Sequence, residues 1–241
     1  MRWIYISPHL DDAVLSAGGL IYEQVHAGND VEIWTFMCGF PPEDQLSPFA
    51  QLLHAQWGIS AAADVVSARR LEDTNAAGIV GAKAIHFDYL DCIYRRGKNG
   101  DWLYSDVFLP PHEDDGDVAA NIAKTISARL KPDDKLVCQF ALGSHLDHVL
   151  VRQAVELLQR PLLYDVDIPY LFTFPQELAP KTAGMKETAH TVSEAGLTSW
   201  QDAIAAYTSQ MVMLFETPEA MREKIRQYWS ENNGIRLWSV E

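Results

Sequence analysis

The sequence contains little cysteine, and this shortage excludes both a disulfide framework and a cysteine-based metal site. Only three of the 241 residues are cysteine (Cys38, Cys92 and Cys138), and each lies among apolar neighbours far from the others. An odd number of widely spaced thiols fits neither a disulfide framework nor a cysteine-based zinc site. We therefore expect three buried, reduced cysteine side chains.

Basic residues and long apolar runs are also scarce. The chain carries 19 lysine and arginine residues against 33 aspartate and glutamate residues, which gives a formal net charge of −14. Such a chain offers no basic footprint for nucleic acid or for an anionic membrane surface. No stretch resembles a signal peptide or a membrane span, so the sequence predicts a cytoplasmic protein with neither nucleic acid nor membrane as a partner.

What the sequence does contain is the alternation typical of an α/β protein. The first forty residues read as a short apolar strand (Trp3–Ser7), a helix of small and apolar residues (Ala13–Ala27) and a second strand (Asp30–Cys38). This order opens a parallel sheet. Gly18 and Gly19 inside the helix predict close packing on the sheet or a bend.

The rest of the chain continues this alternation, and no repeat or linker divides it. A length of 241 residues with 48% hydrophobic content suits one large domain spanning residues 1–241. The predicted fold is α/β, a Rossmann-like, mostly parallel sheet with helices on both faces and a metal site at the carboxyl ends of the strands. Further strands are expected at 83–90, 135–141, 161–166 and 170–174, helices at 65–81, 118–130, 149–159, 199–214 and 221–229, a loop and helix at 41–60, and a hairpin or flap at 94–117.

Two short polar runs carry the chemistry, namely Ser-Pro-His-Leu-Asp-Asp at residues 7–12 and His-Leu-Asp-His at residues 145–148. Each follows a predicted strand, and loops at the carboxyl ends of parallel strands converge on the ligand crevice. Catalytic zinc takes three nitrogen or oxygen ligands from the protein and keeps one open position. His9, Asp12 and one histidine of the second run would supply such a set.

Taken singly, each run has an ordinary interpretation. Two histidines three positions apart are usually unrelated surface residues, and an aspartate pair after a strand is a common helix cap. The occurrence of both runs, each after a predicted strand, favours a hydrolytic metal site over either interpretation.

The same residues resemble those of a known family. The run Ser-Pro-His-Leu-Asp-Asp-Ala-Val-Leu-Ser-Ala-Gly-Gly, with the later His-Leu-Asp-His, looks like the LmbE/PIG-L family of zinc-dependent N-acetylglucosaminyl deacetylases. Arg-Arg-Leu-Glu at 69–72, Asp91 and Ala-Tyr-Thr-Ser-Gln at 206–210 agree with that family. Leu10 and Ala13 depart from it, since proline and glutamate are frequent there, and no tyrosine stands at 142–144, where some relatives have one.

The resemblance implies a role for each motif residue. Asp11 is the expected general base. His145 is expected to polarise the carbonyl or to act as an acid, and Asp147 to orient His145 from behind, as a carboxylate orients an imidazole. The implied ligands of Zn²⁺, or of another divalent ion such as Fe²⁺, are His9, Asp12 and His148.

Two further residues are candidates for substrate binding. Arg69 would donate hydrogen bonds to a sugar or phosphate, although a solvated helix face would explain Arg69 and Arg70 equally well. Asp91 follows a predicted strand and is therefore expected at the same crevice.

The implied reaction removes an N-acetyl group from an N-acetylglucosamine-type sugar, as a small molecule or glycan, through a metal-activated water. An amidase acting on a thiol-sugar conjugate or another N-acyl compound would use the same chemistry. A metal-dependent phosphoesterase usually needs two metals and extra carboxylates, and the sequence offers one three-ligand set. A catalytically silent metal- or sugar-binding protein is a further alternative. Relatives often assemble as homo-oligomers, so self-association is also considered.

Overall fold

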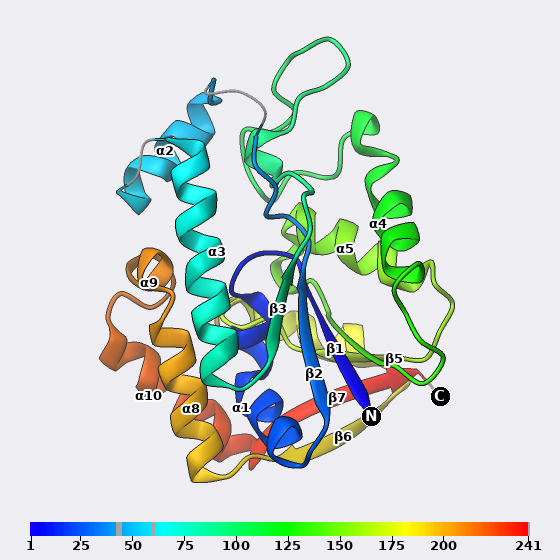
Figure 1. Ribbon diagram of the computed structural model, residues 1–241, viewed down its shortest axis with the longest axis vertical. Helices are drawn as coiled ribbons and strands as arrows, with labels where there is room; N and C mark the ends of the chain where they lie inside the picture. Colours follow the sequence, from blue (N-terminus) through cyan, green and yellow to red (C-terminus); the bar gives the residue numbers. More distant parts are fainter. Residues whose placement is uncertain (42–44, 59–60, 241) are drawn as a thin grey trace.

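A seven-stranded sheet runs through the computed structural model, which describes residues 1–41, 45–58 and 61–240 (Figure 1). β3, β2, β1, β4 and β5 are parallel to one another, and β7 runs antiparallel to both β5 and β6. The predicted α/β fold with a mostly parallel sheet is confirmed. In spatial order the strands are β3 (Lys83–His86), β2 (Asp30–Thr35), β1 (Arg2–Ser7), β4 (Lys135–Gln139), β5 (Leu162–Asp165), β7 (Gly234–Val240) and β6 (Met185–Thr191).

The strand order reverses between β1 and β4, and this reversal places the site. From β1 the chain winds outward through β2 to β3 and then returns past β1 to form β4 and β5. β1 pairs with both neighbours, so that Tyr5 stands opposite Ile33 on one side and Val137 on the other. In doubly wound sheets, a crevice opens at the carboxyl ends of the two strands that flank such a reversal.

Helices cover both faces of the sheet, and Figure 1 shows α3 and α8 on one side of the strands with α4 and α5 on the other. None of the described helices is long and apolar enough to cross a membrane. The three cysteines are buried free thiols, as predicted. The helices are α1 (Asp12–His26), α2 (Pro48–Trp57), α3 (Ala62–Ile79), α4 (Val118–Ser127), α5 (Leu146–Glu156), α6 (Tyr170–Thr173), α7 (Leu178–Thr182), α8 (Glu194–Ala205), α9 (Thr208–Phe215) and α10 (Pro218–Asn232).

The side chains of β1 show how the interior divides into two cores. Successive side chains of a strand point to opposite faces. Tyr5 accordingly packs with apolar residues of α1, α8 and α10, whereas Ile4 and Ile6 pack with those of α4 and α5. Trp200 of α8 presses on α1 so closely that its ring would lie 2.5 Å from a Cβ on Gly18. Gly18 and Gly19 therefore allow α8 to pack closely against α1. We predicted instead that they allow close packing on the sheet or a bend.

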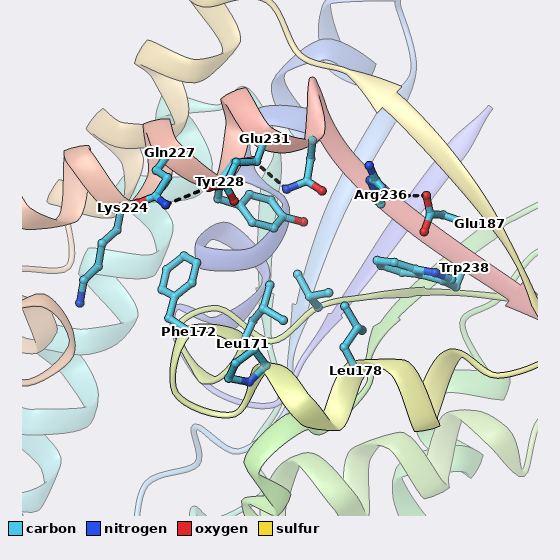
Figure 2. Close-up of a pocket in the computed structure, with 13 residues that line it drawn as sticks. Leu171, Phe172, Leu178, Glu187, Lys224, Gln227, Tyr228, Glu231, Arg236 and Trp238 are labelled. Atoms are coloured by element: carbon cyan, nitrogen blue, oxygen red, sulfur yellow. Dashed lines mark hydrogen bonds and ion pairs between the residues drawn. The ribbon is translucent and has the colours of Figure 1, made fainter.

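Residues 170–174 are predicted as a strand but form the helix α6. Tyr170 and Phe174 lie four residues apart, and a helical turn brings both rings against Gly143, where a Cβ would lie 2.8 Å and 3.0 Å from them. The same turn directs Leu171 and Phe172 into a separate cavity (Figure 2). Contacts on both sides thus outweigh the strand preference of these residues.

The predicted helix at 199–214 is divided into α8 and α9. Tyr207 leaves the helical path between them, and its hydroxyl donates a 2.8 Å hydrogen bond to Asp73. Glu72 then accepts hydrogen bonds from the backbone N–H of Ser209 at 2.9 Å and from its hydroxyl at 2.7 Å. These bonds satisfy the first turn of α9, which no periodicity in the sequence reveals.

Other boundaries differ from prediction for local reasons. β6 and β7 are not predicted, since β6 is almost entirely exposed and polar and shows no apolar alternation. β2 and β3 end at Thr35 and His86, earlier than expected. α5 begins at Leu146 because the Nδ1 atom of His145 accepts the backbone N–H of Asp147 at 3.2 Å and caps the helix. The predicted loop and helix at 41–60 contains α2, with 42–44 and 59–60 outside the described residues.

A Gly234→Ala substitution should destabilise the fold markedly. Gly234 has a φ of +130°, and a Cβ there would lie 2.1 Å from the carbonyl oxygen of His190 in the paired strand. Strain and clash together should cost at least ~2 kcal/mol, which lowers the melting temperature by about 4–8 °C for a chain of this size. Gly100→Ala is the matched control, since Gly100 has a φ of +84° and no atom within 4 Å. Equal losses in the two variants would contradict the clash.

Candidate functional site

The two polar runs of the sequence meet at the reversal between β1 and β4. The first run follows β1 and leads into α1, and the second follows β4 and leads into α5. They form the floor of a cavity of about 380 Å³. Every predicted site residue except Asp147 lines this cavity, namely His9, Asp11, Asp12, Arg69, Asp91, His145 and His148.

Three donor atoms converge at the centre of this floor. The Oδ2 atom of Asp12 lies 3.3 Å from Nδ1 of His9 and 3.4 Å from Nε2 of His148. Ligand atoms about 2.0–2.1 Å from a tetrahedral zinc ion stand roughly 3.3 Å apart, so each of these two distances matches that between neighbouring ligands of one cation. The same oxygen of Asp12 also accepts the backbone N–H of His9 at 2.7 Å. All three side chains are at least nine-tenths buried. The set is consistent with a divalent metal centre.

Two overlapping groups of ligand atoms also lie within 4.8 Å of one another, one formed by His9, His145 and His148 and the other by His9, Asp91 and Asp147. The second group is a poor ligand set because both oxygens of Asp147 are already engaged. Its Oδ1 pairs with Arg95, and its Oδ2 accepts the backbone N–H of Cys92 at 3.0 Å. Asp147 is therefore better placed to hold the side chain of His9 than to bind a metal itself.

Each histidine of the central set has a carboxylate on its other nitrogen. Nε2 of His9 lies 3.1 Å from Oδ2 of Asp147, and Nδ1 of His148 lies 3.0 Å from Oδ1 of Asp167. Histidines that bind metals usually donate their second N–H in this way, which fixes the ring and the nitrogen that faces the metal. The prediction that Asp147 orients His145 needs correction, because its carboxylate contacts His9 and only its backbone N–H reaches His145.

Asp167 and Arg95 were not identified from the sequence. Asp167 follows β5, so its place after a strand was an available signal. Nothing in the sequence marks Arg95, which lies in the polar stretch 94–117. Its guanidinium is 7% exposed and lies between Asp147 and Asp115, with an Nη1–Oδ2 distance of 3.2 Å to Asp115. Burial alone would raise the pKa of Asp147, but Arg95 and His9 hold it below its usual range.

Asp11 is placed for proton transfer. It occupies the N-cap position of α1, yet its side chain makes no capping hydrogen bond, so the helix-cap interpretation does not account for it. Oδ2 of Asp11 lies 3.4 Å from Nη2 of Arg69. Burial and the adjacent Asp12 charge raise the pKa of Asp11 to about 7, although Arg69 opposes the shift. Such a carboxylate exchanges a proton near neutral pH.

His145 is a neutral imidazole at the edge of the same floor. Burial, together with the nearby rings of His9 and His148, holds the pKa of His145 well below its usual value. Its Nδ1 accepts the backbone N–H of Asp147, so the proton of the neutral ring is on Nε2. The ring can therefore donate one hydrogen bond into the cavity.

Both predicted substrate-binding residues face this cavity. Arg69 is 9% exposed, and its guanidinium lies 5.2 Å from the ring centre of Trp57, so a solvated helix face does not describe it. Arg70 points elsewhere and donates to the carbonyl of Cys38 at 2.7 Å. Asp91 accepts the backbone N–H of Ile93 at 3.1 Å, and its second oxygen lies 3.9 Å from Nε2 of His9.

A second, larger cavity of about 470 Å³ contains none of these groups (Figure 2). In Figure 2, Leu171, Phe172 and Leu178 face side chains of α10 across it, and Arg236 pairs with Glu187 at one end. It holds no imidazole and no cluster of metal-binding atoms among the described residues. The smaller cavity is therefore the candidate functional site, although it is not the larger of the two.

Known proteins share this fold. The structure superimposes on teicoplanin deacetylase Orf2 in its zinc-inhibited form with a TM-score of 0.82 and 28% identity, covering 99% of this chain and 97% of that one. A deacetylase–teicoplanin complex gives a TM-score of 0.79 and 27% identity over 99% of this chain and 97% of that one. The 2'-N-acetylparomamine deacetylase of Niallia circulans is 26% identical over 184 residues, which cover 70% of this chain and 67% of that protein.

The family model described as GlcNAc-PI de-N-acetylase matches residues 4–158, which is more than half of the chain and includes both polar runs. Two related solved deacetylases span nearly its whole length. This protein therefore belongs to the PIG-L family, to which the LmbE-like proteins belong.

Proposed function

We propose that the protein is a zinc-dependent N-deacetylase that hydrolyses the acetamide of an N-acetylglucosamine-type sugar or glycoconjugate. The observation that carries this proposal is the set of three neighbouring donors with the carboxylate of Asp11, paired only with Arg69 at 3.4 Å, beside it and open to one cavity. The related proteins are deacetylases. One of them is named for an N-acetylated aminosugar compound, which supports an N-acetyl sugar as the substrate class.

His9, Asp12 and His148 would hold the metal. When bound, a zinc ion lowers the pKa of a coordinated water from ~16 to about 7 and polarises a carbonyl oxygen. Nitrogen and oxygen donors suit Fe²⁺ as well as Zn²⁺. Excess zinc is to be avoided in assays, because one relative is described in a zinc-inhibited form.

Asp11 moves the proton in this scheme. Its carboxylate takes one proton from the attacking water, whose oxygen forms a bond to the carbonyl carbon of the acetamide. When the carbon–nitrogen bond breaks, Asp11 returns this proton to the departing amine nitrogen. The immediate products are acetic acid, which then loses its proton to become acetate, and the free amino sugar, and Asp11 is again a carboxylate.

His145 stabilises the oxygen on which negative charge develops. Its Nε2–H donates a hydrogen bond to the former carbonyl oxygen while Nδ1 stays fixed by the backbone of α5. The Nε2–H bond is the donor that this geometry offers to the cavity. We therefore assign His145 to polarisation of the carbonyl and assign the proton of the amine to Asp11.

Asp147 and Asp167 position the ligand histidines, and Arg95 positions Asp147. Arg69 and Asp91 flank the floor with a cation and a carboxylate, which can donate to and accept from sugar hydroxyls. A phosphoesterase with two metals has less support, because the second donor group depends on Asp147, whose two oxygens are already engaged by Arg95 and by the backbone N–H of Cys92.

Asp11→Asn should abolish most of the activity without removing the metal. The amide keeps the shape of the carboxylate but takes no proton from water, so kcat should fall by about 10²–10⁴-fold. Amine release from N-acetylglucosamine and metal content per chain measure the two effects. Asp12→Asn is the control, since it should lose metal as well as activity. An Asp11→Asn enzyme of unchanged kcat would refute the assignment of the base.

The stability of the metal-free protein should depend on Asp11 and on pH. The folded pKa of Asp11 is raised to about 7 by burial, whereas an unfolded aspartate titrates near ~3.9. Asp11 therefore contributes stability that is complete below pH ~4 and is lost as pH rises toward 7. In the presence of a chelator, Asp11→Asn should raise the melting temperature more at pH 8 than at pH 5. An equal difference at both pH values would contradict the raised pKa.

Asp167→Asn should weaken metal binding. The amide oxygen can still accept from Nδ1 of His148 but carries no charge to strengthen that ligand, and loss of such a partner typically costs ~10–100-fold in metal affinity. The amine of the amide replaces Oδ2, which accepts the backbone N–H of Leu142 at 3.0 Å, so the variant also loses this hydrogen bond. Competition with a chromophoric chelator measures the affinity. Asp165→Asn is a matched control because Asp165 is equally buried but contacts neither histidine. Similar affinities for the two variants would show that Asp167 has no orienting role.

A further inference from the structure

The mouth of the reaction cavity is formed by apolar side chains, in contrast to its charged floor. We name this group the collar. It comes from three separate segments, since α2 and α9 each supply part of it and the stretch after residue 105 supplies the rest. The collar consists of Phe49, Leu53, Trp57, Phe108, Met213 and Leu214.

Two collar residues are exposed and the other four are partly buried. Phe108 is 51% exposed and Met213 is 48% exposed, whereas His9 and Asp11 on the floor are 8% and 6% exposed. The charged groups of the cavity are therefore buried, while its apolar side chains reach the solvent. Exposed apolar side chains gathered around a cavity mark a surface that binds something apolar.

The collar is fixed relative to the floor. The carbonyl of Val107 accepts the backbone N–H of Leu146, the first residue of α5, at 2.8 Å, so Phe108 is held beside His145. On the other side, Glu72 binds the first turn of α9 through Ser209. A preformed apolar surface loses little ordering entropy when a ligand binds, so its contacts contribute fully to affinity.

Polar groups at the cavity are too few for a long polar ligand. Apart from the groups assigned to metal binding and chemistry, the side chains with charged, amide or hydroxyl groups that line it are Arg69, Asp91, Asp106, Tyr170 and Gln210. They suffice for the hydroxyls of one sugar ring beside the floor. Beyond that ring, a ligand would meet the hydrocarbon and aromatic faces of the collar, with carboxylates and one arginine nearby, which disfavours an anionic extension.

We propose that the collar is a subsite for an uncharged aromatic aglycone attached to the N-acetylated sugar. This inference rests on the proposed deacetylase function and adds the class of glycoconjugate to it. Phe49, Trp57 and Phe108 offer the edge and face contacts that aromatic groups prefer. The collar is continuous with the reaction cavity, so the group that reaches it is the part of the substrate joined to the reacting sugar. Binding energy from this remote part favours the transition state at the floor.

The test compares N-acetylglucosamine with its phenyl β-glycoside and phenyl α-glycoside as substrates of the metal-loaded enzyme. We expect kcat/KM to be at least ~10-fold higher for one phenyl glycoside than for the free sugar, as apolar pockets discriminate to this extent. In Leu53→Ser and Met213→Ser, the ratio of the two kcat/KM values should fall at least ~5-fold, by the same reasoning. A ratio near one in the parent enzyme, for both anomers, would overturn the proposal.

Leu52→Ser and Val212→Ser are matched controls. Both residues neighbour collar residues on the same helices, are 58% and 76% exposed, and do not line the cavity. Their ratios should equal that of the parent, and losses as large as those of the collar variants would refute a specific subsite. A change in oligomeric mass confined to the collar variants would instead make the collar an interface between copies and overturn the proposal.

A binding measurement with glucosides that cannot be deacetylated distinguishes failure of the subsite from failure of the proposed deacetylase function. Calorimetry uses the phenyl and methyl glucosides in both anomeric forms, none of which has an acetamide. For at least one anomer, the phenyl compound should bind the parent more tightly than the methyl compound does, and more tightly than it binds Met213→Ser. If no N-acetyl sugar is deacetylated but this difference persists, the subsite stands and the reaction assignment fails. If deacetylation occurs and the phenyl and methyl glucosides bind alike for both anomers, the subsite fails alone.

Discussion

The parallel pairing of β1 with β4 is the constraint on which the rest of the site depends. The two strands are more than a hundred residues apart in the chain, yet their register brings both carboxyl ends to one edge. Only this pairing places an oxygen of Asp12 between His9 and His148. A slip of one residue would turn every side chain of β1 to the other face. The two cores that hold β1 in register therefore also hold the metal-binding atoms in place.

The centre concentrates opposite charges in a small buried volume. Four carboxylates, those of Asp11, Asp12, Asp147 and Asp167, lie around imidazoles and two guanidinium groups. Burying so many ionisable groups is costly unless each has a partner. The partners are distributed unevenly, since Asp147 has several and Asp11 has only a distant arginine. Because of this inequality, Asp147 stays ionised, whereas Asp11 exchanges its proton near neutral pH.

The sequence predicts the parallel order of the sheet and the residues that line the floor because both depend on local patterns. Apolar runs end at the polar motifs, and the motifs carry the metal-binding side chains. The orienting role of Asp147 could not be predicted, since a motif places His145 beside it in sequence while the fold places His9 beside it in space. The role of Arg95 and the helical form of α6 were not predicted, for a similar reason. Their positions are set by partners far along the chain, and periodicity records only near neighbours.

The involvement of Arg95 has a consequence for how this protein can change in evolution. Arg95 stands at the base of a small hairpin, where Arg96 bridges to Trp102, and it reaches Asp147, whose other oxygen lies 3.1 Å from His9. The tip of the hairpin around Gly100 has open space about it. Lengthening of the tip is therefore compatible with an intact centre, whereas a deletion that shifts the base by one residue removes the support of His9. The tip of this surface hairpin can therefore vary in sequence and length. Its base at Arg95 cannot, because it supports the residues of the candidate site.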